Sequence, residues 1–363
     1  MQLIFIIRKL ESTMSQFKMQ LSCPLPELDF DIITMGHGSG GLLTNKLLDD
    51  VILNLFSTEN ESERHDGAFL MLEGKSAFTT DSFVVSPLFF PGGNIGDLAV
   101  NGTVNDLAMC GAIPKHLSLS LIIEEGLPLT ELWEVLLTIQ DCCKKSGVQI
   151  VTGDTKVVER GKGDKLFINT AGIGWVHPQA NIGISRVKPG DKIIVSGPLA
   201  AHGMAIMSVR EGLEFETEIQ SDTAPLHQPV EALLNQFGAA IHLLRDPTRG
   251  GVGTVLNEIA RAANLGVNLR QADIKVEEAV AGACELLGLD PLYVANEGIF
   301  LAIVAKEVHE KILEQLKSAN GHPRATVIGE ITTEHPRQVV LTSAIGGRRV
   351  VNMLAGEQLP RIC

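Results

Sequence analysis

The sequence has little positive charge, and its cysteines lack the paired spacing of zinc and redox sites. Its 30 Lys and Arg residues stand against 43 Asp and Glu residues, a formal net charge of −13. This balance disfavours the phosphates of nucleic acids and of anionic membrane surfaces as partners. None of the six cysteines forms a C-x-x-C pair. We therefore expect no zinc or dithiol motif, and a reduced, cytoplasmic setting.

The N-terminal segment also lacks a long apolar run. Leu3 to Ile7 is short and is followed by Arg8 and Lys9, which reverses the order of a secretory signal, and it cannot span a bilayer. We expect neither export nor a membrane partner. With 363 residues, 45% of them hydrophobic, the chain has the length and composition for about two or three packed domains.

Short β-branched segments alternate with amphipathic helical segments, which predicts an α/β or α+β fold. A passage at 177–190 that contains Pro and Gly predicts a boundary between two such units. We expect an extension over 1–29, an N-terminal domain over 30–180, a C-terminal α/β domain over 181–350 and a mobile tail over 351–363.

A glycine-rich loop, Gly36-His37-Gly38-Ser39-Gly40-Gly41, comes just before a predicted helix. The backbone N–H groups of Gly38, Gly40 and Gly41 could approach a phosphate, with the helix N-terminus adding its dipole. The loop is not a Walker A motif, because no Gly-Lys-Ser/Thr follows. A flexible glycine linker is the alternative interpretation.

Three acidic clusters accompany this loop. Asp81 lies in a polar stretch of an apolar strand region, where a carboxylate is costly unless it binds something or is a structural buried Asp. Asp97, Asn101 and Asn105 recur every fourth residue and line one helical stripe, with Asp106 beside it; a solvated helix face is the alternative. The third cluster is Gly153-Asp154-Thr155-Lys156, expected as a turn at the end of a strand.

Oxygen ligands of this kind suit Mg²⁺, which bridges carboxylates to substrate phosphates. The predicted metal ligands are therefore Asp81, Asp106 and Asp154, within an ATP site that also includes Asn105 and Thr155. Lys156 offers a point charge for a phosphoryl oxygen.

The second half adds two candidate turns and a terminal thiol. Asp246 to Gly251 opens a predicted helix, and Arg249 there could clamp an anion, although a simple capped turn has the same pattern. Glu297, between Asn296 and Gly298, could face a cleft or belong to an ordinary turn. Cys363 ends the sequence and does not fit the prenylation motif; a group carrier on a flexible tail is the functional interpretation.

The HGSGG loop, TTDSFVVSPLFFPGGNIGDLAVNGTVNDLAMCGA, VTGDTKVV, DPTRGGV and the terminal PRIC together resemble the HypE family of nickel-iron hydrogenase maturation proteins. The resemblance runs from about Phe30 to Cys363. It implies the two-domain PurM-like fold of the superfamily that includes aminoimidazole ribonucleotide synthetase, selenophosphate synthetase and thiamine-monophosphate kinase. In that fold the N-terminal domains form a homodimer around a shared β-barrel.

The resemblance also implies a reaction. The carbamoyltransferase HypF would load a carbamoyl group on Cys363, and ATP-dependent dehydration of the thiocarboxamide would give a thiocyanate, whose cyanide passes to iron on the HypC–HypD scaffold. Lys156 would neutralise charge on the transferred phosphoryl group. The proton acceptor stays open between Glu297 and His202. The alternatives are a superfamily kinase or synthetase of a small molecule with an idle Cys363, and a scaffold without catalysis.

Overall fold

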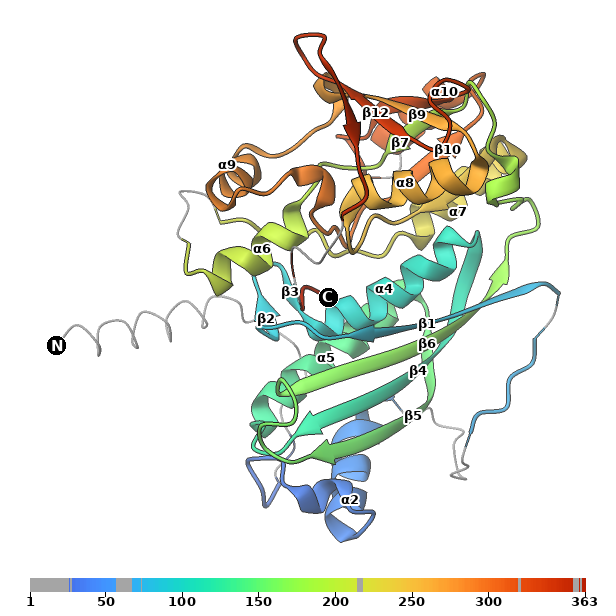
Figure 1. Cartoon of the computed structure of the whole chain (residues 1–363). Helices are drawn as coiled ribbons and strands as arrows, with labels where there is room; N and C mark the ends of the chain where they lie inside the picture. Colours follow the sequence, from blue (N-terminus) through green and yellow to red (C-terminus); the bar gives the residue numbers. More distant parts are fainter. Residues whose placement is uncertain are drawn as a thin grey trace.

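The computed structural model describes residues 26, 28–56, 67–72, 74–213, 218–318, 321–354, 359 and 361–363. The expected N-terminal extension over 1–29 therefore lies outside the described residues except for 26, 28 and 29. Two α/β units follow one another along the chain, one above the other in Figure 1. The predicted fold class is thus confirmed.

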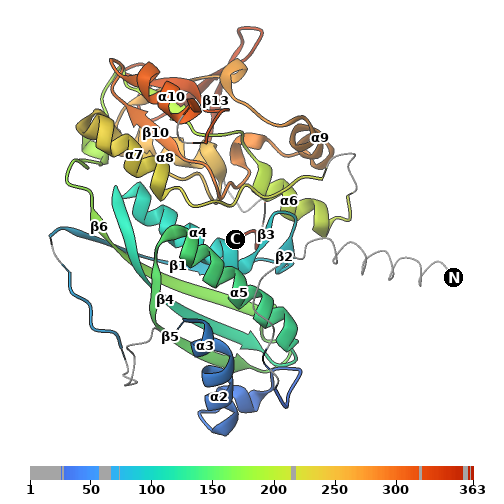
Figure 2. The same ribbon diagram turned by 180° about the vertical axis from the view of Figure 1, so that it is seen from behind.

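The N-terminal unit is built on a four-stranded sheet with the order β1-β6-β4-β5. Its strands are β1 (Ser76–Phe83), β4 (Ala112–Glu124), β5 (Gln149–Val158) and β6 (Leu166–Val176). Alternate residues of β4 and β6 are buried, as expected for strands with one covered face. The helices α4 (Ile95–Met109) and α5 (Leu129–Ser146) cover that face (Figure 2).

A local capping signal defines where α4 begins. The Asn94 side chain accepts a hydrogen bond from the Gly96 amide, and the Asp97 carboxylate accepts one from the Asn94 amide, a capping box that begins α4. Asp97 thus stabilises a helix end.

Beside β5 lie α2 (Leu42–Lys46), the π-helical η3 (Leu47–Leu53) and α3 (Asn54–Phe56), which bury Leu47 and Val51.

The expected turn at Gly153-Asp154-Thr155-Lys156 is wrong, because this segment is part of strand β5. The parallel ladder between β4 and β5 continues as far as Val158. Gly153 makes this possible because a Cβ at that position would be 2.2 Å from the Leu119 carbonyl oxygen of β4. The glycine thus allows close strand pairing and does not mark a turn.

The C-terminal unit is a seven-stranded sheet with the order β13-β12-β9-β11-β7-β10-β8. Its strands are β7 (Lys192–Val195), β8 (Ile241–Arg245), β9 (Gly266–Arg270), β10 (Leu301–Val304), β11 (Thr326–Thr332), β12 (Val339–Thr342) and β13 (Arg348–Val351). Its helices are α6 (Ala201–Arg210), α7 (His227–Phe237), α8 (Gly251–Ala263), α9 (Glu278–Leu287) and α10 (His309–Ser318).

Side chains that alternate along β7 belong to two hydrophobic clusters. Ile194 packs with residues of α7 and α10, whereas Ile193 and Val195 belong to the cluster that contains residues of α6 and α8. The central strand is therefore covered on both faces, which explains its unbroken apolar sequence. No helix within the described part of the chain is long and apolar enough to cross a membrane.

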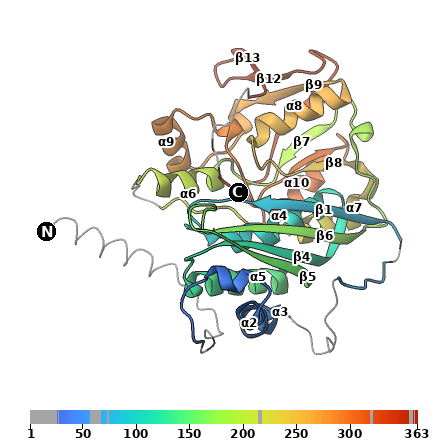
Figure 3. The ribbon, with the colours of Figure 1, turned by 60° about the horizontal axis from the view of Figure 1, so that its bottom comes forward.

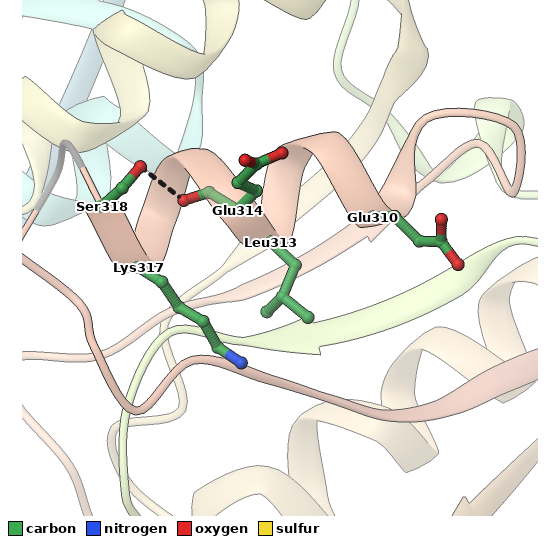
Figure 4. Close-up of a pocket in the computed structure, with 5 residues that line it drawn as sticks. All are labelled: Glu310, Leu313, Glu314, Lys317 and Ser318. Atoms are coloured by element: carbon green, nitrogen blue, oxygen red, sulfur yellow. Dashed lines mark hydrogen bonds between the residues drawn. The ribbon is translucent and has the colours of Figure 1, made fainter.

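A shallow pocket lies on the outer surface of α10 (Figure 4). It is lined by Glu310, Leu313, Glu314, Lys317 and Ser318, and the Ser318 hydroxyl donates to the Glu314 carbonyl oxygen. None of these residues belongs to the predicted ATP, metal or carrier site. The candidate site lies elsewhere, where the C-terminus enters the space between α4, β1 and α6 (Figures 1 and 3).

Candidate active site at the C-terminal tail

The last three residues of the chain continue alongside the end of β1. The Val84 amide donates to the Cys363 carbonyl oxygen at 3.1 Å, and the Ser86 amide donates to the Arg361 carbonyl oxygen at 3.3 Å. Bonds at alternate residues are the pattern by which an extended segment adds to a strand. Ile362, between them, is 2% exposed and belongs to the main hydrophobic cluster. The tail is therefore held inward.

Helix α6 contacts the tail from the other side. His202, 0% exposed, bonds through Nε2 to the Ile362 carbonyl oxygen at 2.8 Å. Arg210 donates through Nη2 to the Arg361 carbonyl oxygen and through Nε to the Ser86 carbonyl oxygen. Burial lowers the pKa of His202 to about 4, so its ring is neutral. His202 thus contacts tail backbone, and both of its ring nitrogens have partners.

The Cys363 thiol bonds to the Glu297 carboxyl group. Burial, and then the neighbouring negative charges of Asp222 and Asp246, raise the pKa of Glu297 well above its usual range. Burial and the Glu297 charge raise the pKa of the Cys363 thiol in the same way. Glu297 is 4% exposed, and its Oε1 has no hydrogen-bond partner among the described residues. A buried acceptor of this kind is costly unless a ligand reaches it.

The backbone on either side of the Glu297 peptide is held by Asp222. The Asp222 carboxylate accepts from the Glu297 amide and from the Gly298 amide, each at 3.1 Å. A Cβ at Gly298 would be 1.6 Å from the Asp222 carbonyl oxygen, so only glycine allows this close approach. Asp222 lies in an irregular segment between α6 and α7, and no motif of the sequence marks it.

Three further carboxylates come together beside the thiol: Asp81 of β1, Asp106 of α4 and Asp246 before α8. Burial raises the pKa of each, and the Asp81 charge further raises that of Asp106. Burial and the charges of Asp106 and Asp81 raise the pKa of Asp246 to about 7. The positive charge of Arg249 acts on both Asp81 and Cys363. The structure thus brings together Asp81, Asp106 and the Asp246–Arg249 turn, which belong to separate motifs of the sequence.

This cluster has the donor chemistry that a divalent cation requires. Its carboxylates raise one another's pKa because their negative charges are not balanced locally, and Mg²⁺ takes one or two carboxylates together with phosphate and water oxygens. Within the described part of the chain, no three His, Cys, Asp or Glu side chains already stand at metal-binding spacing. Asp81 and Asp106 therefore fit as a partial ligand set that phosphate oxygens would complete.

Asn105 lies in this region, but its side chain joins the two units. Its Nδ2 donates to the Ala224 carbonyl oxygen at 3.0 Å and to the Glu297 carbonyl oxygen at 3.3 Å. Its Oδ1 accepts from the Leu226 amide at 2.7 Å. The amide is thus fully engaged in holding the Glu297 segment against α4. A predicted role in ATP binding stays a prediction.

Asp154 and Lys156 lie apart from this cluster within a single chain. Asp154 is in register with Ser120 of β4, whose neighbours across the sheet are Asn169 and Ser82. Directly opposed residues share a face, so Asp154 is on the face away from α4, about 14 Å, or three strand spacings, from β1. Its carboxylate bonds to Lys156 Nζ at 2.9 Å, and both side chains are more than half exposed.

The glycine loop also lies at the β5 edge of the sheet. A Cβ at Gly38 would be 2.7 Å from the Val157 amide nitrogen of β5. The loop therefore packs against the edge strand that lies farthest from β1 in the sheet. One chain therefore does not bring Gly38, Gly40, Gly41, Asp154 or Thr155 to the Asp81 cluster. Their predicted roles in ATP and Mg²⁺ binding stay predictions that need a further element to join the two groups.

Comparison with known proteins places this arrangement in a class of enzymes. The family model for the N-terminal domain of AIR synthase related proteins matches residues 64–176, and the model for their C-terminal domain matches 188–341. The chain therefore has the two-domain PurM-like fold of the AIR synthase related proteins.

Individual relatives indicate a narrower family within the AIR synthase related proteins. Carbamoyl dehydratase HypE from Bradyrhizobium diazoefficiens is 48% identical over 332 residues, covering 91% of this chain and 96% of that protein. The crystal structure of HypE in complex with ATP is 44% identical, with a TM-score of 0.87, and covers 91% of this chain and 99% of that one. A HypE–HypF complex is also similar, with 44% identity, a TM-score of 0.75, and coverage of 86% and 100%. The chain belongs to the HypE family of carbamoyl dehydratases that act in hydrogenase maturation.

Proposed function

We propose that this chain dehydrates a carbamoyl group carried on its own Cys363 to a thiocyanate, the source of the cyanide ligand in nickel-iron hydrogenase maturation. One observation carries the proposal: the Cys363 thiol is held at Glu297, beside Asp81, Asp246 and Arg249. A small-molecule kinase with an idle tail would leave this buried contact without a purpose. The membership in the HypE family supports the same choice.

The reaction removes one water from the thiocarboxamide S–C(=O)–NH₂. Transfer of a phosphoryl group from ATP to the amide oxygen makes that oxygen a leaving group, and one N–H proton is lost. Cleavage of the C–O bond then releases phosphate, loss of the second N–H proton completes the C≡N bond, and the S–C bond is kept. ADP, phosphate and the S-cyano group are the products. The chain must therefore supply a proton acceptor near sulfur and a site for phosphate groups.

Glu297 is the proton acceptor that the contacts favour. A carbamoyl group on sulfur would place its NH₂ near the buried Oε1 that has no protein partner, and burial keeps the carboxylate basic. A carboxylate whose pKa is raised is a stronger base than an ordinary one, which favours a role in general base catalysis. His202 is less suited because its neutral ring is engaged on both nitrogens.

ATP and Mg²⁺ are proposed to bind beside Cys363, where Asp81, Asp106, Asp246 and Arg249 lie. The ATP complex of the similar HypE supports a nucleotide site in this fold. Arg249 would offer a bidentate contact to a phosphate group. Asp81 and Asp106 would hold the cation, which balances their charges and the phosphate charge.

We propose that a homodimer completes this site. The face of the N-terminal sheet away from α4 exposes Phe78 at 70% and Trp175 at 39% near one end of the strands and Ile122 at 41% near the other. Phe78 and Trp175 are diagonal neighbours across the β1–β6 pair, and exposed apolar neighbours of this kind are typical of interaction surfaces. Asp154 and Lys156 lie on the same face. Pairing of two such faces would form the shared β-barrel and give the partner subunit access to a site that one chain leaves divided.

Two further partners follow from the chemistry. A carbamoyltransferase of the HypF type would load Cys363, and the similarity to a chain in a HypE–HypF complex supports this pairing. A HypC–HypD scaffold is proposed to receive the cyanide. The described cysteines are all free, which supports a reducing compartment such as the cytoplasm.

The test is the intact mass of the protein after incubation with HypF, carbamoyl phosphate and ATP, with Cys363→Ala in parallel. We expect the wild-type protein to gain one carbamoyl group and then, in excess Mg-ATP, to lose the mass of one water. The variant should show neither change. ATP hydrolysis without either mass change would overturn the proposal in favour of a small-molecule kinase.

A further inference from the structure

Two side chains at opposite ends of α6 hold consecutive carbonyl groups of the tail. His202, in the first turn, bonds to the Ile362 oxygen, and Arg210, the last residue of the helix, donates to the Arg361 oxygen. Because the next residue is Cys363, these contacts act one and two peptides away from the reacting sulfur. They can therefore determine where the sulfur lies.

The orientation of the His202 ring is itself specified. The Thr223 amide donates to Ser221 Oγ at 3.1 Å, which leaves the Ser221 hydroxyl hydrogen for His202 Nδ1 at 2.8 Å. The ring is neutral and must therefore carry its single proton on Nε2, where it donates to the Ile362 carbonyl oxygen. The Phe90 ring packs edge-on against the imidazole and restricts its rotation.

The segment that orients His202 also holds Glu297. Ser221 and Thr223 stand on either side of Asp222, whose carboxylate accepts from the Glu297 and Gly298 amides. The Ser221 amide in turn donates to the Pro91 carbonyl oxygen at 2.8 Å. One short segment thus connects the group that holds the tail with the group that faces the sulfur.

We propose that His202, oriented by Ser221, is a positioning residue that grips the Ile362 carbonyl group and thereby keeps the Cys363 sulfur at Glu297. The inference rests on the proposed dehydration and assigns His202 no proton transfer. Loss of the hydrogen bond between His202 and Ile362 would free the tail and lower the rate of dehydration, because a tethered group reacts rapidly only when it is held in the reactive geometry.

The effect of the His202–Ile362 contact on the tail can be measured without the dehydration reaction. Iodoacetamide alkylates the Cys363 thiol faster when the tail leaves its buried position. The C-terminal peptide that follows Glu357 contains no other cysteine, so mass spectrometry of this peptide measures the alkylation of Cys363 alone. We expect His202→Leu to raise the alkylation rate about tenfold, since it leaves a buried carbonyl oxygen without a donor. His202→Gln, whose amide can replace the Nε2 donor, should stay within about threefold of the wild type. His227→Leu, a buried histidine of α7, is the matched control.

Ser221→Ala extends the test to the orienting hydroxyl and remains informative if His202→Leu does not fold. It should raise the alkylation rate to a value between those of His202→Gln and His202→Leu. Alkylation at the wild-type rate in both His202→Leu and Ser221→Ala would overturn the proposal. An equal increase in His202→Gln and His202→Leu would also overturn it, because ring packing would then be what matters.

A single-turnover measurement separates positioning from proton transfer. With protein already carbamoylated, His202→Leu should slow dehydration about tenfold at an unchanged half-saturating ATP concentration, and His202→Gln should restore the rate. Slow dehydration in His202→Gln together with normal alkylation would make His202 a proton acceptor instead. If the wild type does not dehydrate at all, the proposed function fails while alkylation still reports on the grip.

Discussion

At the scale of single residues, the site depends on carboxyl groups whose environments differ. Glu297 is buried beside sulfur, whereas Asp222 is partly buried and accepts two backbone amides. Burial raises the pKa of both carboxyl groups, but the amide bonds to Asp222 act in the opposite direction and favour its charged form. The two carboxylates can therefore take different tasks although they lie in adjacent segments. Asp222 holds the loop, and Glu297 is left able to exchange a proton.

Replacement of Glu297 by Gln should stop dehydration while carbamoylation of Cys363 continues. The amide keeps the size of the side chain but cannot accept a proton, and loss of a general base typically costs about 10² to 10⁴ in rate. Accumulation of the carbamoylated species, followed by intact mass, checks this. The Asp222→Asn variant is a useful comparison because it should weaken folding of the loop as well. Normal thiocyanate formation by Glu297→Gln would refute the assignment.

The Asp246 carboxyl group should make stability depend on pH. Its pKa of about 7 is above that of an unfolded aspartate, so the folded state binds more protons than the unfolded state between about pH 4 and pH 7. Unfolding free energy therefore falls as the pH rises through this window, by at most about 4 kcal/mol for this group.

Asp246→Asn should remove that dependence. In urea titrations with a chelator present, the variant should be about as stable as wild type at pH 4 and increasingly more stable than wild type as the pH rises to 8, because the buried charge is gone. Parallel stability profiles for the two proteins would contradict this account. The same variant should bind ATP less tightly if Asp246 belongs to the nucleotide site.

At the scale of elements, α4 is the part that connects packing to the site. Its first turn is fixed by Asn94, and its last turns carry Asn105, which contacts Ala224, and Asp106, which contacts Thr79. Thr79 Oγ1 of β1 donates to Asp106 Oδ2 at 2.7 Å. An error in the orientation of this helix would therefore displace the carboxylate and the Glu297 segment together.

Asn94→Ala should destabilise the protein by about 1 to 2 kcal/mol. The substitution removes the cap on the Gly96 amide and also the bond from Asn94 Nδ2 to Thr138 Oγ1 of α5, 2.8 Å long. Asn94→Ser keeps a side-chain acceptor for the cap and loses the donor to Thr138, so it should lose less. Urea unfolding of both variants checks the order, and equal losses would show that the cap contributes little.

At the scale of the whole molecule, the exposed face of the N-terminal sheet sets the expected assembly. Phe78→Lys should convert the proposed dimer to a monomer, since it places a charge beside the exposed Trp175 on that face. Leu286→Lys, on α9 and 65% exposed, is the matched control and should leave the dimer intact. Sedimentation equilibrium measures both. A monomeric wild-type protein would refute the dimer.

The sequence predicts much of the fold and part of the site, for identifiable reasons. Leu43, Leu47, Val51 and Leu55 recur every fourth residue, a spacing that predicts one apolar helical face. Leu47, Val51 and Leu55 are buried, whereas Leu43 is 37% exposed. Asp81 and Asp154 look equivalent in sequence, yet strand order and register separate them by most of a sheet. Asp222 and Arg210 act through backbone groups of distant segments, and no local pattern marks such a role.

Four groups of the protein hold the tail by its main chain. Val84, Ser86, His202 and Arg210 all contact backbone oxygens of residues 361–363, and none of these bonds touches the sulfur. These bonds therefore remain available to the free thiol and to both of its loaded forms, whereas the bond between the thiol and Glu297 is available only to the free thiol. Loading of the carrier is thus expected to change the contacts of the sulfur and to leave the main chain of the tail in place.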